Sequence, residues 1–320
     1  MFTLRQYLLA LLDSRGLTRT LGEIDVCRDE QGRPCFSAGN SAAVFRIRLG
    51  GRIRSLRCYL RPMRHLKEIY GQRLLEKELY LHTSPETGVW VDTVLGDWIE
   101  GSTLHETVAQ AAALRDRESL QILVRLFDRL ALALVTDDRA HGDLKPENII
   151  VGDDGTLCPI DFDASYLPAF AGEISPELGT AAYQHPARTA ADFDERIDDY
   201  PAALISTALH ALAEDPTLWD RYGSSDGLLY TPQRIASDPA YRETLALFEK
   251  RGMAVQYRIA QLLTAPTLRL FGLAELLAEA VREKPAVRSG TEAETPELFV
   301  ENGRWGYRTA ERVVVAPLYD

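Results

Sequence analysis

Hydrophobic and polar positions in the first third of the chain have the spacing of strands, preceded by one helix. The start, MFTLRQYLLALLDSRG, has the interrupted apolar pattern of an amphipathic helix. The segment EIDVCRDEQGRPCFSAG predicts two strands joined by a Gly-Arg-Pro turn. In AAVFRIRLGGRIRSLRCYL, the residues Phe45, Ile47 and Leu49 alternate with arginines before a Gly-Gly pair, which predicts a hairpin.

Helical spacing dominates the rest of the chain, with a few strands between the helices. Residues 65–81 and 115–138 are predicted helices. In the second helix five apolar residues recur at helical spacing: Leu120, Leu123, Phe127, Leu130 and Leu134. Thr103 and Glu106 form a predicted capping box at the start of another helix. Strands are predicted for VWVDTVLGDWIE and for NIIV and LCPIDF, which flank GDDGT as a hairpin.

The order of these elements predicts the fold class. Beyond Pro201 the predicted elements are almost all helical, whereas the first third is rich in strands. Strands and helices that are segregated along the chain are typical of α+β proteins. The sequence therefore predicts an α+β fold with two lobes.

Composition narrows the class of protein without changing this outline. The 320 residues are 46% hydrophobic and 26% charged, as in ordinary soluble globular proteins. A net charge of −11 argues against nucleic acid as a partner. No apolar run approaches the roughly 18 residues of a membrane span, so no membrane contact is expected. The four cysteines have neither metal-site nor disulfide spacing, which indicates a reducing compartment and a cytoplasmic location.

The charge is unevenly distributed along the chain. Residues 1–80 contain 15 Lys and Arg against 8 Asp and Glu, so this part is basic although the whole chain is acidic. Seven arginines lie close together here: Arg46, Arg48, Arg52, Arg54, Arg57, Arg61 and Arg64. We interpret them as a solvated strand face, and an anionic ligand or partner is the alternative.

The stretch AHGDLKPENIIVGDDGTLCPIDFD, residues 140 to 163, concentrates polar residues in a strand-rich segment. Asp143 and Asn148 precede the predicted hairpin, and Asp161 ends its second strand. Because a hairpin returns its end to its start, these three side chains are expected to meet at one rim. Carboxylate and amide oxygens in this arrangement suit Mg²⁺ bound together with phosphates. A remaining acid can act as a base, and Lys145 adds a positive charge, which completes the set of groups that phosphoryl transfer requires.

The same stretch resembles the catalytic loop and metal-binding segment of protein kinases. HGDLKPEN stands in place of the family's HRDLKPEN, and IDFD stands in place of DFG, in the same order. The resemblance implies ATP and Mg²⁺ as cofactors, Asp143 as the base and Lys145 as the charge near the transferred phosphoryl group. It also implies that Asn148 and Asp161 hold the metal ion. The HGD form is similar to atypical bacterial serine/threonine kinases.

Upstream segments resemble the nucleotide-binding part of that family. SAGNSAAV resembles the Gly-rich loop, with Gly39 at its middle glycine and Val44 at the family's valine. Arg57, in SLRC, stands where the family has a phosphate-binding lysine. Glu76, on the predicted helix 65–81, is the expected partner of Arg57. Two other candidates for this role are Glu78 and Glu68.

Further landmarks follow in the family's order. VLGDWIEGSTL resembles the hinge between the lobes, where backbone groups of the segment from Asp97 to Ile99 would bind an adenine edge. LGTAAYQHPAR resembles the end of the activation segment, with Thr180 and Pro186 at recognisable positions. IDDYPAALISTALHAL resembles the buried helix that braces the catalytic loop, with Asp198 as its anchoring acid.

Three positions depart from the protein-kinase pattern. Gly142 replaces the Arg beside the catalytic Asp, so activation through a phosphate on the activation segment is not expected. Asp163 replaces the Gly that follows Asp161-Phe162, and Ala187 replaces the Glu of the usual Ala-Pro-Glu. HGD with IDFD also resembles aminoglycoside and other small-molecule phosphotransferases of the same fold, whereas the downstream landmarks favour a protein kinase.

The C-terminal residues differ from the rest in composition. Residues 283–297 are charged and rich in Pro, Gly and Ser, which predicts a linker. Residues 298–320 resemble a single WG repeat, with Trp305-Gly306 and a Pro-x-Tyr-Asp ending, and such repeats imply protein contacts. They usually occur in series, and a lone hairpin that caps the kinase body is the alternative. The expected division is an N-terminal helix 1–20, a kinase N-lobe 21–97, a kinase C-lobe 98–282, the linker and the repeat.

These observations predict an ATP- and Mg²⁺-dependent phosphotransferase that acts on a hydroxyl group of a protein substrate. One alternative is a pseudokinase, a nucleotide-binding module whose partner is recruited by the WG segment. Arg57, the depleted Gly-rich loop and Asp163 motivate that alternative. The other alternative is a kinase for a small molecule, and the acidic charge of the remainder of the chain would suit a cationic substrate.

Overall fold

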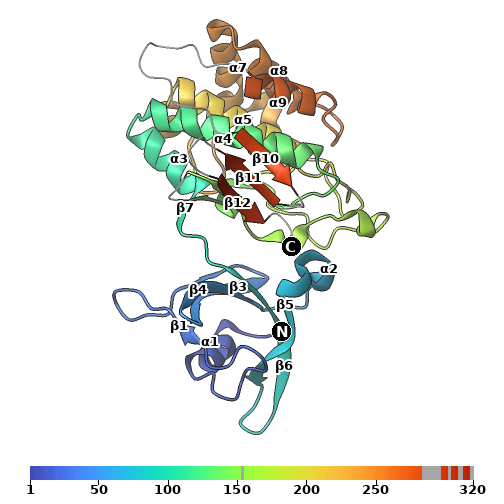
Figure 1. The fold of residues 1–320 in the computed structure, drawn as a ribbon. Coiled ribbons are helices and arrows are strands. Elements are labelled where there is room, and N and C mark those ends of the chain that lie inside the picture. Colours follow the sequence, from blue (N-terminus) through green and yellow to red (C-terminus); the bar gives the residue numbers. More distant parts are fainter. Residues whose placement is uncertain (153–154, 283–296, 302–303, 309–312, 318–320) are drawn as a thin grey trace. The chain divides into compact units, whose positions relative to one another are not determined.

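The computed structural model describes residues 1–152, 155–282, 297–301, 304–308 and 313–317. The chain divides into two compact units, and the boundary follows Ile99. The first unit is built on a sheet, and the second unit is mainly helical, as the ribbon in Figure 1 shows. The predicted α+β fold is therefore confirmed.

The sheet of the first unit is antiparallel and has six strands. Their order is β1-β3-β4-β6-β5, and β2 pairs with β3 beside β1. The strands are β1 (Asp25–Val26), β2 (Phe36–Ala38), β3 (Ala42–Leu49), β4 (Arg52–Tyr59), β5 (Leu74–His82) and β6 (Gly88–Asp97). The hairpin predicted around Gly50-Gly51 is confirmed, since Leu49 faces Arg52 and both glycines have positive φ.

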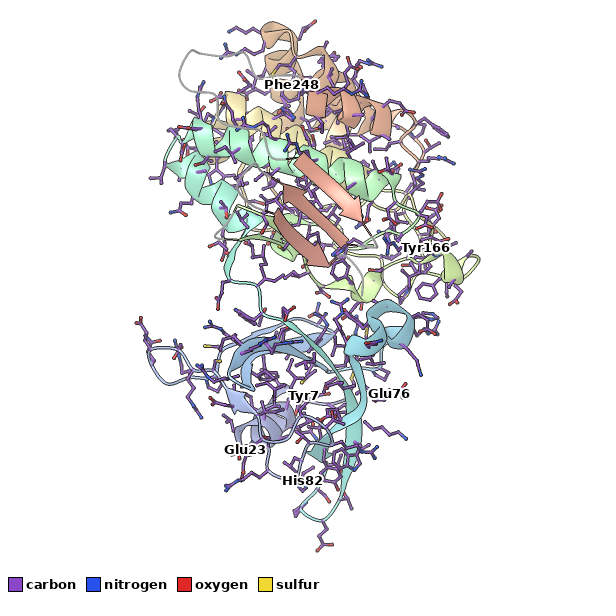
Figure 2. The ribbon with its side chains drawn as sticks, in the orientation of Figure 1. Tyr7, Glu23, Glu76, His82, Tyr166 and Phe248 are labelled. Atoms are coloured by element: carbon purple, nitrogen blue, oxygen red, sulfur yellow. The ribbon has the colours of Figure 1, made fainter. Side chains whose placement is uncertain are left out.

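One face of this sheet is covered by the N-terminal helix. Helix α1 (Leu4–Leu12) has the predicted amphipathic pattern and begins with a capping box from Thr3 to Gln6. Tyr7 is fully buried and donates a hydrogen bond from its hydroxyl to the carbonyl of Tyr59 at 2.7 Å (Figure 2). The apolar side chains of α1 join the inward-facing residues of β3 and β4 in a single core. This helix is thus part of the first unit.

The helix predicted for residues 65–81 is wrong over most of its length. Only α2 (Leu66–Tyr70) is helical, a short 3₁₀ turn follows, and β5 begins at Leu74. The residues of this segment include strong helix formers, but Leu79 and Leu81 are buried against the sheet as β5 pairs with β6. Tertiary pairing has therefore overridden local propensity.

The second unit consists of helices around a small sheet. The sheet has the order β7-β8-β9 and comprises β7 (Gly101–Thr103), β8 (Ile149–Gly152) and β9 (Leu157–Pro159). The helices are α3 (Leu104–Ala113), α4 (Arg117–Thr136), α5 (Asp199–Glu214), α6 (Leu218–Tyr222), α7 (Pro239–Arg251), α8 (Ala254–Leu262) and α9 (Leu273–Arg282). The predicted capping box at Thr103 is present, and α4 confirms the helix predicted over 115–138.

Strands of the C-terminal segment form a sheet of their own. Strands β10 (Glu297–Glu301), β11 (Arg304–Arg308) and β12 (Val313–Pro317) pair in antiparallel order, with Trp305-Gly306 in the middle strand. The linker predicted for 283–297 lies outside the described residues except for Glu297, as do Asn302 and Gly303. Among the helices that the structure describes, none combines the length and the apolar character needed to cross a bilayer.

Candidate active site

A hairpin brings the two predicted metal ligands to one end of β8 and β9. Ile149 faces Pro159 across the strands, and the backbone N–H of Ile160 donates to the carbonyl of Asn148 at 2.9 Å. Asp161 follows Ile160 directly. Asn148 and Asp161 therefore lie at the same end of the hairpin, as the order of loop, hairpin and loop predicts.

The carboxylate of Asp143 is the centre of a hydrogen-bond network. Its Oδ1 atom accepts from the backbone N–H of Thr180 at 2.5 Å. Its Oδ2 atom lies 3.1 Å from Lys145 Nζ and accepts from Asn148 Nδ2 at 3.2 Å. Lys145 Nζ also donates to the Thr180 hydroxyl at 2.9 Å. Four polar residues are thus joined in one network around one carboxylate.

The side-chain amide of Asn148 has a defined orientation. Its Nδ2 atom donates to both the backbone carbonyl and the carboxylate of Asp143, at 2.9 and 3.2 Å. Because the two ends of an amide point apart, the Oδ1 atom is directed away from Asp143 and can serve as a ligand for a hard cation. The assignment of nitrogen and oxygen follows from these hydrogen bonds.

Asp161 occupies an unusual backbone conformation. Its φ of +68° lies in the left-handed region, which Asp tolerates better than most other residues. The next three residues form a 3₁₀ turn in which Phe162 and Asp163 are buried. One carboxylate and one amide oxygen fit Mg²⁺, which usually keeps waters and phosphate oxygens as its other ligands. The described residues contain no cluster of three or more His, Cys, Asp or Glu side chains that could hold a metal without such help.

Asp198, at the start of α5, anchors the loop that contains Asp143. Its carboxylate accepts from the backbone N–H groups of His141 and Gly142, at 2.5 and 3.0 Å. Burial raises the pKa of Asp198, while the neighbouring His141, these N–H donors and Arg188 oppose the rise. The resemblance implies this anchoring role, and the contacts give it a physical basis.

Gly142 has a steric reason to lack a side chain. Its φ is +80°, and a Cβ atom built on it would lie 2.1 Å from the carbonyl oxygen of Ala164. This close approach follows from the pairing of Ala140 with Tyr166, whose N–H and carbonyl groups exchange two hydrogen bonds. An arginine at position 142 is incompatible with this backbone.

Arg188 is a residue of this site that the sequence did not single out. It is only 9% exposed, and its Nη1 atom donates to the carbonyl of Gly142 at 3.2 Å and to Gln184 Oε1. Residues 137–199 contain 15 Asp and Glu but only 4 Lys and Arg. An arginine in so acidic a segment was the available signal, although Arg139 and Arg196 share it.

The predicted nucleotide-binding residues of the first unit lie on β3, β4 and the turn before them. Gly39 is in the β2–β3 turn, where its N–H donates to the carbonyl of Ala42 at 2.9 Å. Val44 faces Arg57, and Arg57 faces Val94 on the next strand. Residues that face each other across neighbouring strands project to the same side of a sheet. Val44 and Arg57 are therefore brought together on the face opposite Phe45 and Leu56.

Glu76 does not lie on a helix, contrary to the prediction. It is on β5, its side chain is 61% exposed, and its carboxylate pairs with Lys67 at 3.3 Å (labelled in Figure 2). The register of β5 against β6 shifts between Leu75 and Leu79, and Lys77 within this bulge has a φ of +51°. A bulge of this kind redirects side chains locally.

Glu78, the first alternative to Glu76, has a different role. It is 1% exposed, and its carboxylate accepts from the backbone N–H groups of Arg19, Thr20 and Leu21 at 2.8–3.1 Å. The Thr20 hydroxyl adds a fourth donor at 2.6 Å. Glu78 therefore fastens the segment that follows α1 to the edge of the sheet.

The hinge positions end the first unit. Asp97 is the last residue of β6, its carboxylate lies 3.4 Å from Arg54 Nε, and its backbone carbonyl accepts from the Ser55 hydroxyl at 3.1 Å. Ile99 is the last residue before the second unit. The backbone groups of this segment stay the predicted adenine contacts.

Comparison with known proteins gives distant similarities to kinases. No family model matches the chain. It is 28% identical over 213 residues to the serine/threonine-protein kinase PknL of Mycobacterium tuberculosis, covering 63% of this chain and 52% of that protein. It is 28% identical over 172 residues to CBL-interacting protein kinase 17 of rice (Oryza sativa subsp. japonica), covering 51% of this chain and 35% of that protein. The chain thus spans about half or less of the length of these relatives, and the similarity supports, at low identity, a place in the protein kinase superfamily.

Proposed function

We propose that the chain is an ATP- and Mg²⁺-dependent serine/threonine protein kinase of bacterial type. The observation that carries the proposal is the network in which Asp143 contacts Thr180, Lys145 and Asn148. A carboxylate held by fixed donors is oriented to receive a substrate hydroxyl without further rearrangement. One distant relative is named as a serine/threonine-protein kinase and the other as a protein kinase, which favours this reaction over other uses of the fold.

The residues have distinct roles in the proposed reaction. Asp143 orients the substrate hydroxyl and takes its proton. The hydroxyl oxygen then forms a bond to the γ-phosphorus as the bond from that phosphorus to the β–γ bridging oxygen breaks, and ADP leaves with the electron pair. Lys145 offsets the charge on the transferred group, and Asn148 and Asp161 would hold Mg²⁺. The metal ion, when bound, neutralises charge on the β- and γ-phosphates.

The first unit gives the pseudokinase a specific argument of its own. Helix α2 has only five residues, and Glu76 lies on a strand and pairs with Lys67. An ion pair between the strand cation and a helix glutamate is part of the active arrangement in protein kinases. The second candidate is therefore a nucleotide-binding module that does not transfer phosphate, with protein partners bound through the WG segment.

The test compares wild-type protein with two variants that each lose one carboxylate. Purified protein is incubated with ATP, Mg²⁺ and a generic protein substrate, and phosphate incorporation is measured by mass spectrometry of the intact chains. Asp143→Asn should lower transfer by about a thousandfold or more while the protein stays folded. Asp138→Asn removes a carboxylate that is 80% exposed and should transfer phosphate at the wild-type rate.

The outcomes separate the candidates. Equal transfer by wild type and Asp143→Asn would exclude Asp143 as the base. Binding of ATP that requires Mg²⁺, detected as a thermal shift without phosphate transfer, would favour the pseudokinase. Phosphorylation of an aminoglycoside, with no transfer to protein, would favour the small-molecule kinase.

A further inference from the structure

Gly142 is held on both sides by buried charged groups. Asp198 accepts from its N–H at 3.0 Å, and Arg188 donates to its carbonyl at 3.2 Å. Asp198 and Arg188 are 1% and 9% exposed. The two charges therefore act on the two peptide groups that flank Gly142, the second of which leads into Asp143. A residue held at its N–H and at its carbonyl has little freedom to rotate the two peptide groups that flank it.

The segment that contains Arg188 is attached to the same loop at a second point. The Thr180 N–H donates to Asp143 Oδ1, and Gly179 packs so closely that a Cβ atom there would lie 2.7 Å from the carbonyl oxygen of Gly142. Gly179 also has a φ of +72°, so a glycine is required at this position. The segment 179–188 is thus bound to the catalytic loop at both of its ends.

The surroundings of Arg188 explain why a buried cation is tolerated. Burial lowers its pKa, and four carboxylates oppose this: Asp198, Asp143, Asp192 and Asp194. A guanidinium stays charged at neutral pH even when its pKa falls, because its ordinary value is above 12. A buried charge of this kind is retained only where opposite charges compensate it.

We propose that Arg188 is a positioning residue for phosphoryl transfer, which fixes the peptide next to Asp143 and holds segment 179–188 against the catalytic loop. The effect on phosphoryl transfer rests on the proposed kinase function. The hydrogen bond from Arg188 to the Gly142 carbonyl, called the clasp below, does not depend on that function. Position 142 cannot carry the arginine that the family places beside the catalytic Asp. Here the cation comes from residue 188 and binds a backbone carbonyl, so the segment is held without a phosphate group.

Arg196 provides a matched control within the same region. It is also partly buried, and its Nη1 atom donates to a backbone carbonyl, that of Val135 at 2.6 Å. Val135 lies on α4, outside the catalytic loop. Arg196→Met therefore removes a similar buried contact without touching Gly142. Arg188→Lys keeps the charge and one donor, and Arg188→Met removes both.

The test has two readouts, one of which needs no activity. Hydrogen exchange of residues 140–145 and 179–185 is measured without nucleotide, and kcat and KM for ATP are measured on a protein substrate. Arg188→Met should speed exchange in both segments by about tenfold or more and lower kcat about 10- to 100-fold, with KM changed less than about twofold. Arg188→Lys should recover most of both losses, and Arg196→Met should change neither readout.

The results would decide the proposal in each case. If folded Arg188→Met shows the same hydrogen-exchange rates as wild type in residues 140–145 and 179–185, the proposal is overturned, whether or not the wild type transfers phosphate. Equal losses of kcat in Arg188→Met and Arg196→Met would overturn it as well, because they would indicate a general structural effect. If Arg188→Met does not fold, Arg188→Gln takes its place, and unchanged exchange at Gly142 and Asp143 in that variant would refute the proposed contact with the Gly142 carbonyl. Absence of phosphate transfer by the wild type, together with faster exchange in Arg188→Met, would refute the kinase function and keep the clasp.

Discussion

The two compact units differ in how they hold the residues that the kinase resemblance identifies. In the second unit, Asp143, Lys145 and Asn148 contact one another within a single loop, and Thr180 contacts both Asp143 and Lys145. In the first unit, Arg57 lies on a central strand, whereas Glu76 lies on the exposed bulge of an edge strand. The geometry of the loop around Asp143 is set mainly by residues close together in the sequence. An ion pair between Arg57 and a glutamate such as Glu76 depends instead on how the chain between these two residues folds.

The difference separates site residues that are placed by local loops from those whose position depends on the packing of distant segments. In the second unit, short loops and a hairpin place Asp143, Lys145 and Asn148 over few residues at little entropic cost, and Thr180 joins them from 37 positions along the chain. The first unit uses its buried acid, Glu78, to fasten the N-terminal segment.

Gly142→Ala should disturb the second unit strongly. A β-carbon there adds the strain of a positive φ to a contact of 2.1 Å with Ala164. We expect a loss of about 2–4 kcal/mol in the free energy of unfolding, measured by urea denaturation, and a fall in any kinase activity. The control is Gly155→Ala, since Gly155 also has a φ of +80° but a Cβ atom there would meet no atom of the described residues within 4 Å. Equal losses in the two variants would show that the close approach to Ala164 contributes nothing.

Glu78→Gln and Glu76→Gln should separate a buried carboxylate from an exposed one on the same strand. Glu78 Oε1 accepts from three backbone N–H groups and Oε2 accepts from the Thr20 hydroxyl, and an amide cannot replace both oxygens as acceptors. The expected loss for Glu78→Gln is about 2–3 kcal/mol in the stability of the first unit. Glu76→Gln should cost less than about 0.5 kcal/mol, because its pair with Lys67 is solvent-exposed. A large effect of Glu76→Gln on activity would instead support its predicted role beside Arg57.

Asp199→Asn should remove a pH dependence from the second unit. Burial raises the pKa of Asp199 to about 7, and its Oδ2 atom accepts from the N–H of Leu270. Asp198 raises this pKa further, while Arg196 and Arg269 lower it. A carboxyl with a raised folded-state pKa binds its proton more tightly in the folded protein, so wild-type stability falls as pH rises from about 4 to about 7. The variant should exceed wild type by about 1–2 kcal/mol at pH 8 and match it near pH 4.

Asp215→Asn, at the other end of α5, is the control for this experiment. Burial pushes the pKa of Asp215 upward, but hydrogen bonds from Thr217 and the nearby arginines lower it overall. Its stabilising effect should therefore be present at neutral pH and fade as the pH falls into the acid range. Thermal unfolding at four or five pH values would measure both variants, and parallel curves for wild type and Asp199→Asn would contradict the buried, protonated state of Asp199.

The elements that the sequence predicts well are those fixed by local pattern. Alternation around Gly50-Gly51 matches the β3–β4 hairpin, and the apolar stripe from Leu120 to Leu134 matches α4. The positions of Asn148 before and Asp161 after the hairpin 149–159 were likewise sufficient to predict that both lie at the same end of it. The roles of these site residues stay proposals, since geometry alone does not establish catalysis.

The features that the sequence could not predict depend on contacts between distant segments. Residues 74–82 contain good helix formers, and only the pairing of β5 with β6 makes them a strand. The bulge at Lys77 and the burial of Glu78 follow from that pairing. Likewise, Arg188 is remote from Gly142 along the chain, and only the folded segment brings its guanidinium to the Gly142 carbonyl.

The contacts of Glu78 also have a consequence for the order of folding during synthesis. They join residues that are 57 to 59 positions apart in the sequence. A ribosome must therefore have released β5 before residues 19–21 can find their acceptor, and α1 leaves the exit tunnel well before its sheet exists. During that interval the apolar face of α1 has no core to join. We expect this face to be a binding site for ribosome-associated chaperones on the nascent chain, which selective ribosome profiling would detect as occupancy that ends once β5 has emerged.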